Sequence, residues 1–188
     1  MLASLGSMPL PLPIATARTT LRPFTDNDVD DLLDYHARPG VARYLLEGPL
    51  DRAGVIAKIE RHKTQIGLDT DARAVAVAVE YEGSVVGDVG IWLLDETNER
   101  AEIGWVFSPE VAGKGLATEA VAAFIDAVFA HFPLHRLEAQ MDGRNDASAR
   151  LCERLGMTRE AYLREDFWSK GEWTDTIKYG LLASDRTK

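Results

Sequence analysis

Cysteine is nearly absent from the sequence. Cys152 is the single cysteine among 188 residues, so the chain cannot form an internal disulfide or a cysteine-based metal cluster. His131 and His135 have the spacing of a helical metal-binding pair, but Pro133 lies between them and would break the helix that such a pair requires. The sequence therefore predicts no metal site, and the lack of disulfides agrees with a reducing compartment, the cytoplasm.

Long uncharged apolar runs are also missing. The apolar stretch at residues 116–132 contains Glu119 and Asp126, whereas a membrane-spanning helix needs about 20 consecutive apolar residues. Residues 1–17 lack a basic start and are interrupted by three prolines, which argues against a secretory signal. We expect a protein that does not bind membranes and that stays in the cytoplasm.

Basic residues are too few for nucleic-acid binding. The chain has 21 Lys and Arg against 30 Asp and Glu, which gives a formal net charge of −9. Nonspecific affinity for nucleic acid comes from clustered Lys and Arg, so nucleic acid is not an expected partner. An acidic surface favours cationic substrates, although it also serves solubility.

What the sequence does contain fits one globular domain. The hydrophobic fraction of 46% and the charged fraction of 27% are close to the averages for soluble domains. A chain of this length buries about 70% of its surface on folding, which is enough for a real core. We expect an N-terminal arm at residues 1–17 and a single domain at residues 18–184.

Hydrophobic periodicity predicts an α+β fold with a mostly antiparallel sheet. Asp26 is the expected N-cap of the first helix, and Gly156 is expected to end the last one. The predicted strands cover residues 19–24, 75–81, 85–94, 99–107, 135–141 and two segments on either side of residues 170–171. The predicted helices cover residues 26–36, 51–66, 116–131 and 146–155.

The predicted strands at residues 75–81, 85–94 and 99–107 form an antiparallel meander. A glycine loop joins its third strand to the longest predicted helix, residues 116–131. Gly113 and Gly115 let successive backbone N–H groups point inward at a helix N-terminus, which forms a site for an anion such as a diphosphate. A P-loop is excluded because Lys114 is followed by glycine, and the dinucleotide fingerprint is excluded because Thr118 stands at its third glycine. A glycine-rich turn without a ligand is the remaining alternative.

This loop resembles that of the GCN5-related N-acetyltransferases, which reads Gln or Arg, any two residues, Gly, any residue, then Gly or Ala. Gly115 and Ala117 match the pattern, whereas Ala112 replaces the polar first residue. Residues 145–157 resemble the second signature of the family in the form used by the ribosomal-protein N-terminal acetyltransferase branch. Residues 171–175 resemble that branch and the polyamine acetyltransferases.

The resemblance implies the GNAT fold and acetyl-coenzyme A as co-substrate, with no metal. That fold has a twisted, mostly antiparallel sheet of about seven strands, with helices on both faces and strands splayed to admit coenzyme A. The backbone N–H of Val106 is implied to meet the thioester carbonyl, while an ordinary helix cap for Asn145 and a solvated role for Arg150 stay open. The residues implied to bind the cofactor are Trp105, Val106, Phe107, Gly113, Lys114, Gly115, Leu116, Ala117, Thr118, Asn145 and Arg150.

Transfer to an amine needs a proton acceptor, because a lysine-type amine with a pKa near ~10.4 arrives protonated. Glu102 is the candidate, since strand alternation places it on the face opposite to Ala101 and Ile103. A solvated surface glutamate is the alternative from alternation alone. The resemblance favours the catalytic role, because many family members use a strand glutamate at or near this position.

The group that protonates the leaving thiolate has several candidates. The resemblance implies Ser148 as the proton donor, and Cys152 and water are the alternatives. A non-catalytic role fits Ser148 equally well, in which its hydroxyl only forms hydrogen bonds with the backbone in the first turn of the helix. The segments at residues 35–48 and 167–171 are implied to flank the acceptor. The aromatic residues assigned to the acceptor are Tyr35, Tyr44, Trp92 and Trp168, each of which would also fit a core.

The predicted activity is transfer of the acetyl group of acetyl-coenzyme A to a primary amine by direct attack in a ternary complex. The acceptor is a small-molecule amine such as a polyamine, or a protein N-terminus, and a homodimer is compatible with the resemblance. The alternative is a module that binds or senses acyl-coenzyme A without catalysis. Ala112 and Cys152 motivate it, because both depart from the family pattern.

Overall fold

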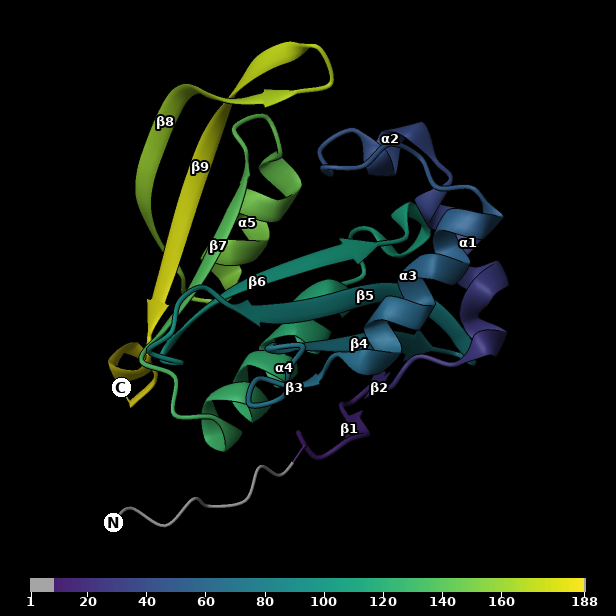
Figure 1. Cartoon of the computed structure of the whole chain (residues 1–188), viewed down its shortest axis with the longest axis horizontal. Helices are drawn as coiled ribbons and strands as arrows, with labels where there is room; N and C mark the ends of the chain where they lie inside the picture. Colours follow the sequence, from purple (N-terminus) through teal and green to yellow (C-terminus); the bar gives the residue numbers. More distant parts are fainter. Residues whose placement is uncertain (1–8, 188) are drawn as a thin grey trace.

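A nine-stranded sheet runs through the protein in the computed structural model, which describes residues 9–187 (Figure 1). The strands are β1 (Ile14–Ala15), β2 (Thr20–Arg22), β3 (Ile66–Gly67), β4 (Ala74–Tyr81), β5 (Ser84–Leu93), β6 (Arg100–Phe107), β7 (Arg136–Asp142), β8 (Thr158–Ser169) and β9 (Glu172–Leu182). Their order is β1-β2-β4-β5-β6-β7-β9-β8, and β3 pairs with β4. Neighbouring strands are antiparallel except β6 and β7, which are parallel.

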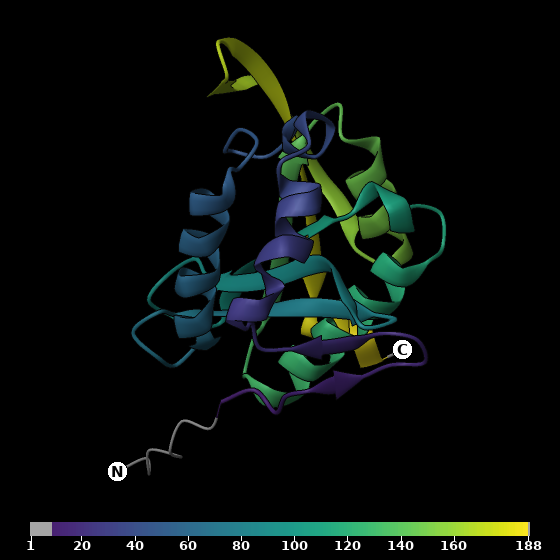
Figure 2. The ribbon, with the colours of Figure 1, turned by 90° about the vertical axis from the view of Figure 1, so that its right-hand side faces the viewer.

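Helices cover both faces of this sheet (Figure 2). The helices are α1 (Val29–His36), α2 (Pro39–Ala42), α3 (Arg52–Thr64), α4 (Leu116–His131) and α5 (Asp146–Arg154), and 3-10 segments occupy Asp26–Asp28, Pro109–Val111 and Ala183–Thr187. α1 and α3 pack on one face, and α4 and α5 pack on the other. Within residues 9–187, no helix has the length and apolarity needed to cross a membrane.

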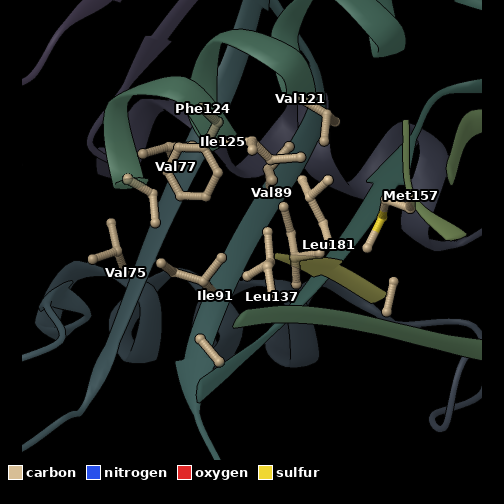
Figure 3. Close-up of a cluster of buried hydrophobic side chains, with 14 of the residues drawn as sticks. Val75, Val77, Val89, Ile91, Val121, Phe124, Ile125, Leu137, Met157 and Leu181 are labelled. Carbon is tan, nitrogen blue, oxygen red and sulfur yellow. The ribbon is translucent and has the colours of Figure 1, made fainter. Parts of the chain in front are cut away.

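The larger hydrophobic core lies between the sheet and α4 (Figure 3). Val121, Phe124 and Ile125 of α4 are buried against Val77 of β4 and Val89 of β5. α4 also contacts α5, β1 and β2, so it is surrounded by protein on several sides. This environment explains why its sequence is apolar nearly all the way round.

Alternation along β4 divides its side chains between two cores. Val75, Val77 and Val79 belong to the core beneath α4, whereas Ala76 and Ala78 belong to a second core beneath α1 and α3. The valines therefore face one layer of helices and the alanines face the other, as expected for alternating side chains on a strand.

Capping residues set the helix ends. Asp51 caps α3 by accepting a hydrogen bond from the backbone N–H of Gly54, and Gly156 follows α5 with a left-handed φ of 77°. The prediction that Asp26 caps the first helical segment is wrong. Thr25 is the N-cap, and its backbone N–H donates to the carboxylate of Asp28. The helical segment therefore begins at Asp26, one residue earlier than a cap at Asp26 would place it.

The predicted fold class is confirmed: the sheet is mostly antiparallel and carries helices on both faces. The seven predicted strands are present, and the two further strands, β1 and β3, have two residues each, too few for periodicity to reveal. β1 lies within the predicted arm and pairs with β2, and Leu10 is buried in the larger core. Residues 1–8 of that arm lie outside the described residues.

β6 and β7 pair only at one end. Their parallel pairing runs from Arg100 with Arg136 to Glu102 with Glu138, and β6 then continues to Phe107 without a partner on that side. Figure 1 shows the two strands diverging beyond this point. The sheet is therefore open between its two halves.

Truncation of Phe124 tests the assigned core. Because Phe124 is fully buried, Phe124→Ala should lower the free energy of unfolding by about 3–5 kcal/mol. Ile56 is 45% exposed on α3, so Ile56→Ala should change it by less than about 0.5 kcal/mol. Urea denaturation followed by circular dichroism measures both, and similar losses in the two variants would contradict this placement of the core.

Candidate active site

The glycine loop presents unpaired backbone N–H groups in front of α4. Gly113 and Gly115 have φ of 75° and 76°, in the left-handed region that glycine adopts without strain. In this loop and the first turn of α4, the backbone N–H groups that donate to no residue among 9–187 are those of Gly113, Gly115, Leu116, Ala117 and Thr118. Such a cluster at a helix N-terminus is suited to an anion, and the exposed Lys114 adds positive charge.

The open edge of β6 leads to this loop. Ser108 donates its N–H to the carbonyl of Val86 on β5, so the alternation of an antiparallel ladder turns the N–H of Val106 toward β5 as well. The main-chain groups of Trp105 and Phe107 point the opposite way, to the side where β6 and β7 separate. This register differs from the expectation that the N–H of Val106 faces the opening.

A cavity of about 540 Å³ lies between β6, β7 and α3. On its floor, Trp92 of β5 is opposite Glu102 of β6, Gly90 is opposite Gly104, and Asp88 lies at the far end. A Cβ on Gly104 would lie 3.0 Å from the ring of Trp92, so glycine leaves room for this ring to lie across β6. The predicted site residues that line the cavity are Tyr44, Trp92, Glu102, Trp105, Val106, Asn145 and Ser148.

Glu102 is partly buried in the cavity wall. Burial raises the pKa of Glu102 above its ordinary value, and this effect outweighs the hydrogen bond that Nε2 of Gln140 donates to its Oε2 at 3.0 Å. The hydrogen bond favours the ionised form and acts in the opposite direction. A carboxylate with a raised pKa is a stronger proton acceptor than one in water.

Ser148 lies in the first turn of α5, at the edge of the cavity. Its Oγ accepts a hydrogen bond from the indole N–H of Trp105 at 3.3 Å, and its backbone N–H donates to Oδ1 of Asn145 at 3.2 Å. Asn145 therefore caps α5. Cys152, the alternative proton donor, is buried in the larger core and does not line the cavity, and burial raises its pKa to about 12.

Two of the four aromatic residues assigned to the acceptor do not line the cavity. Tyr35 is 1% exposed, because its ring is part of the core and its hydroxyl donates to the carboxylate of Asp88. Trp168 is 57% exposed on the β8–β9 hairpin and packs edge-on against Trp173. Arg150 is exposed on α5, also outside the cavity lining.

A buried carboxylate at the far end of the cavity was not predicted from the sequence. Asp88 accepts hydrogen bonds from Nε2 of His36 at 2.8 Å and from the hydroxyl of Tyr35 at 2.9 Å, and Nζ of Lys58 lies 3.2 Å away. Burial tends to raise the pKa of Asp88, but Lys58 and His36 outweigh it and hold this pKa well below its usual range. The available signal was a single charged residue within an otherwise apolar strand.

Lys170 joins the β8–β9 turn to the segment after α2. Its Nζ donates to the backbone carbonyl of Ala42 at 2.5 Å and to that of Arg43 at 3.3 Å. Arg43 and Lys170 both line the cavity, and Figure 1 shows the hairpin curving toward α2. The structure thus brings together the two segments, residues 35–48 and 167–171, that the resemblance implied would flank the acceptor.

Comparison with known proteins agrees with this geometry. A model of the acetyltransferase (GNAT) domain matches residues 18–158. The uncharacterised N-acetyltransferase p20 of Bacillus licheniformis is 31% identical over 167 residues, which are 89% of this chain and 94% of p20. The spermidine N(1)-acetyltransferase of Escherichia coli (strain K12) is 27% identical over 158 residues, covering 84% of this chain and 82% of that enzyme.

A solved structure supports the same assignment. The crystal structure of an acetyltransferase of the GNAT family from Bacillus anthracis matches with a TM-score of 0.81 and 27% sequence identity, covering 91% of this chain and 98% of that one. The chain therefore belongs to the GCN5-related N-acetyltransferase family and is an acyltransferase.

Replacement of Asp88 tests the buried ion pair. Asp88→Asn leaves Lys58 without its counter-charge and should lower the free energy of unfolding at pH 7 by about 3–5 kcal/mol. Since the folded-state pKa of Asp88 is depressed, its stabilising effect is complete above the unfolded-state pKa of about 3.9 and is lost as the pH falls further. The difference between variant and wild type should therefore shrink below about pH 4.

Denaturation curves at pH 7 and pH 3 measure this difference. Asp71 is exposed and makes no ion pair with the described residues, so Asp71→Asn is the matched control and should leave both curves unchanged. A loss of stability in Asp88→Asn that is equally large at both pH values would contradict the ion-pair assignment.

Proposed function

We propose that the protein transfers the acetyl group of acetyl-coenzyme A to a primary amine by direct attack in a ternary complex. The strongest support is that three features adjoin one another. The N–H cluster at the start of α4 follows the open edge of β6, and this edge borders the cavity that contains Glu102. An N–H cluster suits a diphosphate, an open strand edge suits a chain of amides, and a partly buried carboxylate suits proton transfer. Coenzyme A carries the diphosphate and the amides in one molecule.

The loop and the strand edge then have separate tasks. The N–H groups from Gly113 to Thr118, with Lys114, hold the diphosphate. The free main-chain groups of Trp105 and Phe107 pair with the pantetheine amides, and one of their N–H groups stabilises the negative charge that develops on the thioester oxygen. Because these groups are fixed in the sheet, they need no rearrangement during the reaction.

The chemistry moves two protons. The ionised Glu102 accepts a proton from the ammonium group of the acceptor, and the neutral amine attacks the thioester carbon. A C–N bond forms, the C–S bond breaks, and the departing thiolate takes a proton from Ser148, directly or through water. The nitrogen loses its second surplus proton as the amide forms, and this proton restores the hydroxyl of Ser148 through water. Glu102 later releases its proton to solvent. Ser148 lies at the cavity edge beside Trp105, as this role requires.

The acceptor is a small-molecule amine such as a polyamine, or the α-amine of a protein N-terminus. A similar enzyme is named for spermidine, and the protein's net charge of −9 favours a cationic acceptor. Tyr44 and Trp92 border the cavity and are the aromatic residues best placed to contact it. We also propose that the protein is located in the cytoplasm and forms a homodimer.

A panel of amines tests this function. Incubation with acetyl-coenzyme A and spermidine, aminoglycosides or peptides with free N-termini should release coenzyme A thiol with at least one acceptor. Calorimetric titration with coenzyme A runs in parallel. Binding without thiol release from any acceptor would favour a module that only binds acyl-coenzyme A, and failure to bind coenzyme A would contradict both functions.

Glu102→Gln tests the proton acceptor. The variant should lose about 100-fold in kcat/KM at neutral pH, because a general base contributes a factor of about this size or more. Wild-type kcat/KM should fall as the pH drops through the raised pKa of Glu102, because protonation removes the base. The difference in kcat/KM between the variant and wild type should become smaller toward pH ~10, because the acceptor amine is then largely unprotonated.

Glu99→Gln is the matched control, because Glu99 is exposed just before β6 and does not line the cavity. Its pH profile should match that of wild type. A Glu102→Gln profile parallel to wild type across the whole range would remove Glu102 from the mechanism.

A further inference from the structure

Glu119 carries a negative charge at an unfavourable place for the proposed cofactor. It lies in the first turn of α4, directly after the N–H groups that are proposed to hold the diphosphate. The hydroxyl of Thr16 and the groups of Arg18 hold the pKa of Glu119 below its ordinary value, so it is ionised at neutral pH. A carboxylate stabilises an empty helix N-terminus, but it repels a diphosphate that binds at the same terminus.

The turn between β1 and β2 neutralises this carboxylate. Arg18 donates from Nε to Oε2 of Glu119 at 2.7 Å, and its Nη2 lies 2.6 Å from the same oxygen. The backbone N–H of Arg18 and the hydroxyl of Thr16 donate to the other oxygen, Oε1, at 2.7 Å and 2.6 Å. Both carboxylate oxygens are therefore occupied by donors, two of them from a guanidinium that carries a full positive charge.

Arg18 also contacts the loop itself. Its Nη1 donates to the backbone carbonyl of Lys114 at 2.9 Å, and its Nη2 lies 3.5 Å from the place where a Cβ on Gly115 would stand. The guanidinium thus lies against the loop between its two glycines and α4. Its side chain is 46% exposed, so it remains accessible to a ligand on the loop.

We propose that Arg18 is a positioning residue of the diphosphate site, which cancels the charge of Glu119 so that the N-terminus of α4 can accept a second anion. This inference rests on the proposed function. It also offers a source of positive charge beside a loop whose first position, Ala112, has no polar side chain. Arg18 acts on the cofactor through Glu119 and the loop, and takes no part in acetyl transfer.

A double-mutant cycle with coenzyme A tests the charge compensation. Arg18→Ala should weaken coenzyme A binding about tenfold, because it leaves the carboxylate of Glu119 uncompensated. Glu119→Gln should bind within about threefold of wild type, and the double variant Arg18→Ala/Glu119→Gln should recover to about the same level. Arg18→Lys keeps the charge and should also bind within about threefold of wild type.

The affinity of the double variant for coenzyme A distinguishes charge compensation from a purely structural role of Arg18. If Arg18 only braced the fold, removing both partners would leave the double variant as weak as Arg18→Ala, and that result would overturn the proposal. Wild-type affinity in Arg18→Ala would overturn it as well. Calorimetric titration measures all five proteins, wild type included, and thermal unfolding checks that each variant is folded.

Acetyl-pantetheine provides the matched substrate, because it has the thioester and the amides but no diphosphate. Arg18→Ala should turn over acetyl-pantetheine at the wild-type rate while its KM for acetyl-coenzyme A rises, and a parallel loss with both substrates would contradict the proposal. Failure of the proposed function is distinguishable, because wild type itself would then neither bind coenzyme A nor release thiol from either substrate.

Discussion

The incomplete pairing of β6 and β7 is the constraint on which the site depends. The two strands share three residue pairs and then separate, while β6 stays in register with β5 and β7 stays in register with β9. The sheet can therefore open without either strand losing its other partner. Unpaired main-chain groups are costly when buried, so an open edge needs water or a ligand to satisfy it. Here that edge adjoins the N–H cluster before α4, so a ligand with both amides and a diphosphate satisfies the two together.

Three carboxylates show how the surroundings decide what the same chemical group does. Asp88 is buried beside Lys58 and His36, so it stays charged and contributes to stability. Glu102 is only partly buried and has one hydrogen-bond partner among the described residues, Gln140, so its pKa rises and it is suited to proton transfer. Glu119 is held by an arginine at a helix start, where its charge affects an incoming anion. The net charge of −9 counts all three carboxylates alike and gives no information about their different roles.

Features that depend on local geometry were predictable from the sequence. Residues 116–131 were predicted as a helix and form α4 with these bounds, because the apolar pattern and the preceding glycines act over a few neighbouring residues. Gly113 and Gly115 do adopt left-handed φ values, since few other residues do so without strain. The motifs of the loop and of residues 145–157 also indicated the family, which the comparisons confirm.

The sequence by itself determined the order of the elements, the glycine loop and the side of β6 on which Glu102 lies, because each follows from periodicity or backbone preference along a short segment. Only the tertiary structure decided that the N–H of Val106 turns toward β5, since this depends on the register between two strands. It also decided that Tyr35 supports Asp88 instead of lining the cavity, and that Arg18 meets Glu119. These pairs are 53 and 101 residues apart, and no local pattern specifies which distant side chains will meet when the helices pack on the sheet.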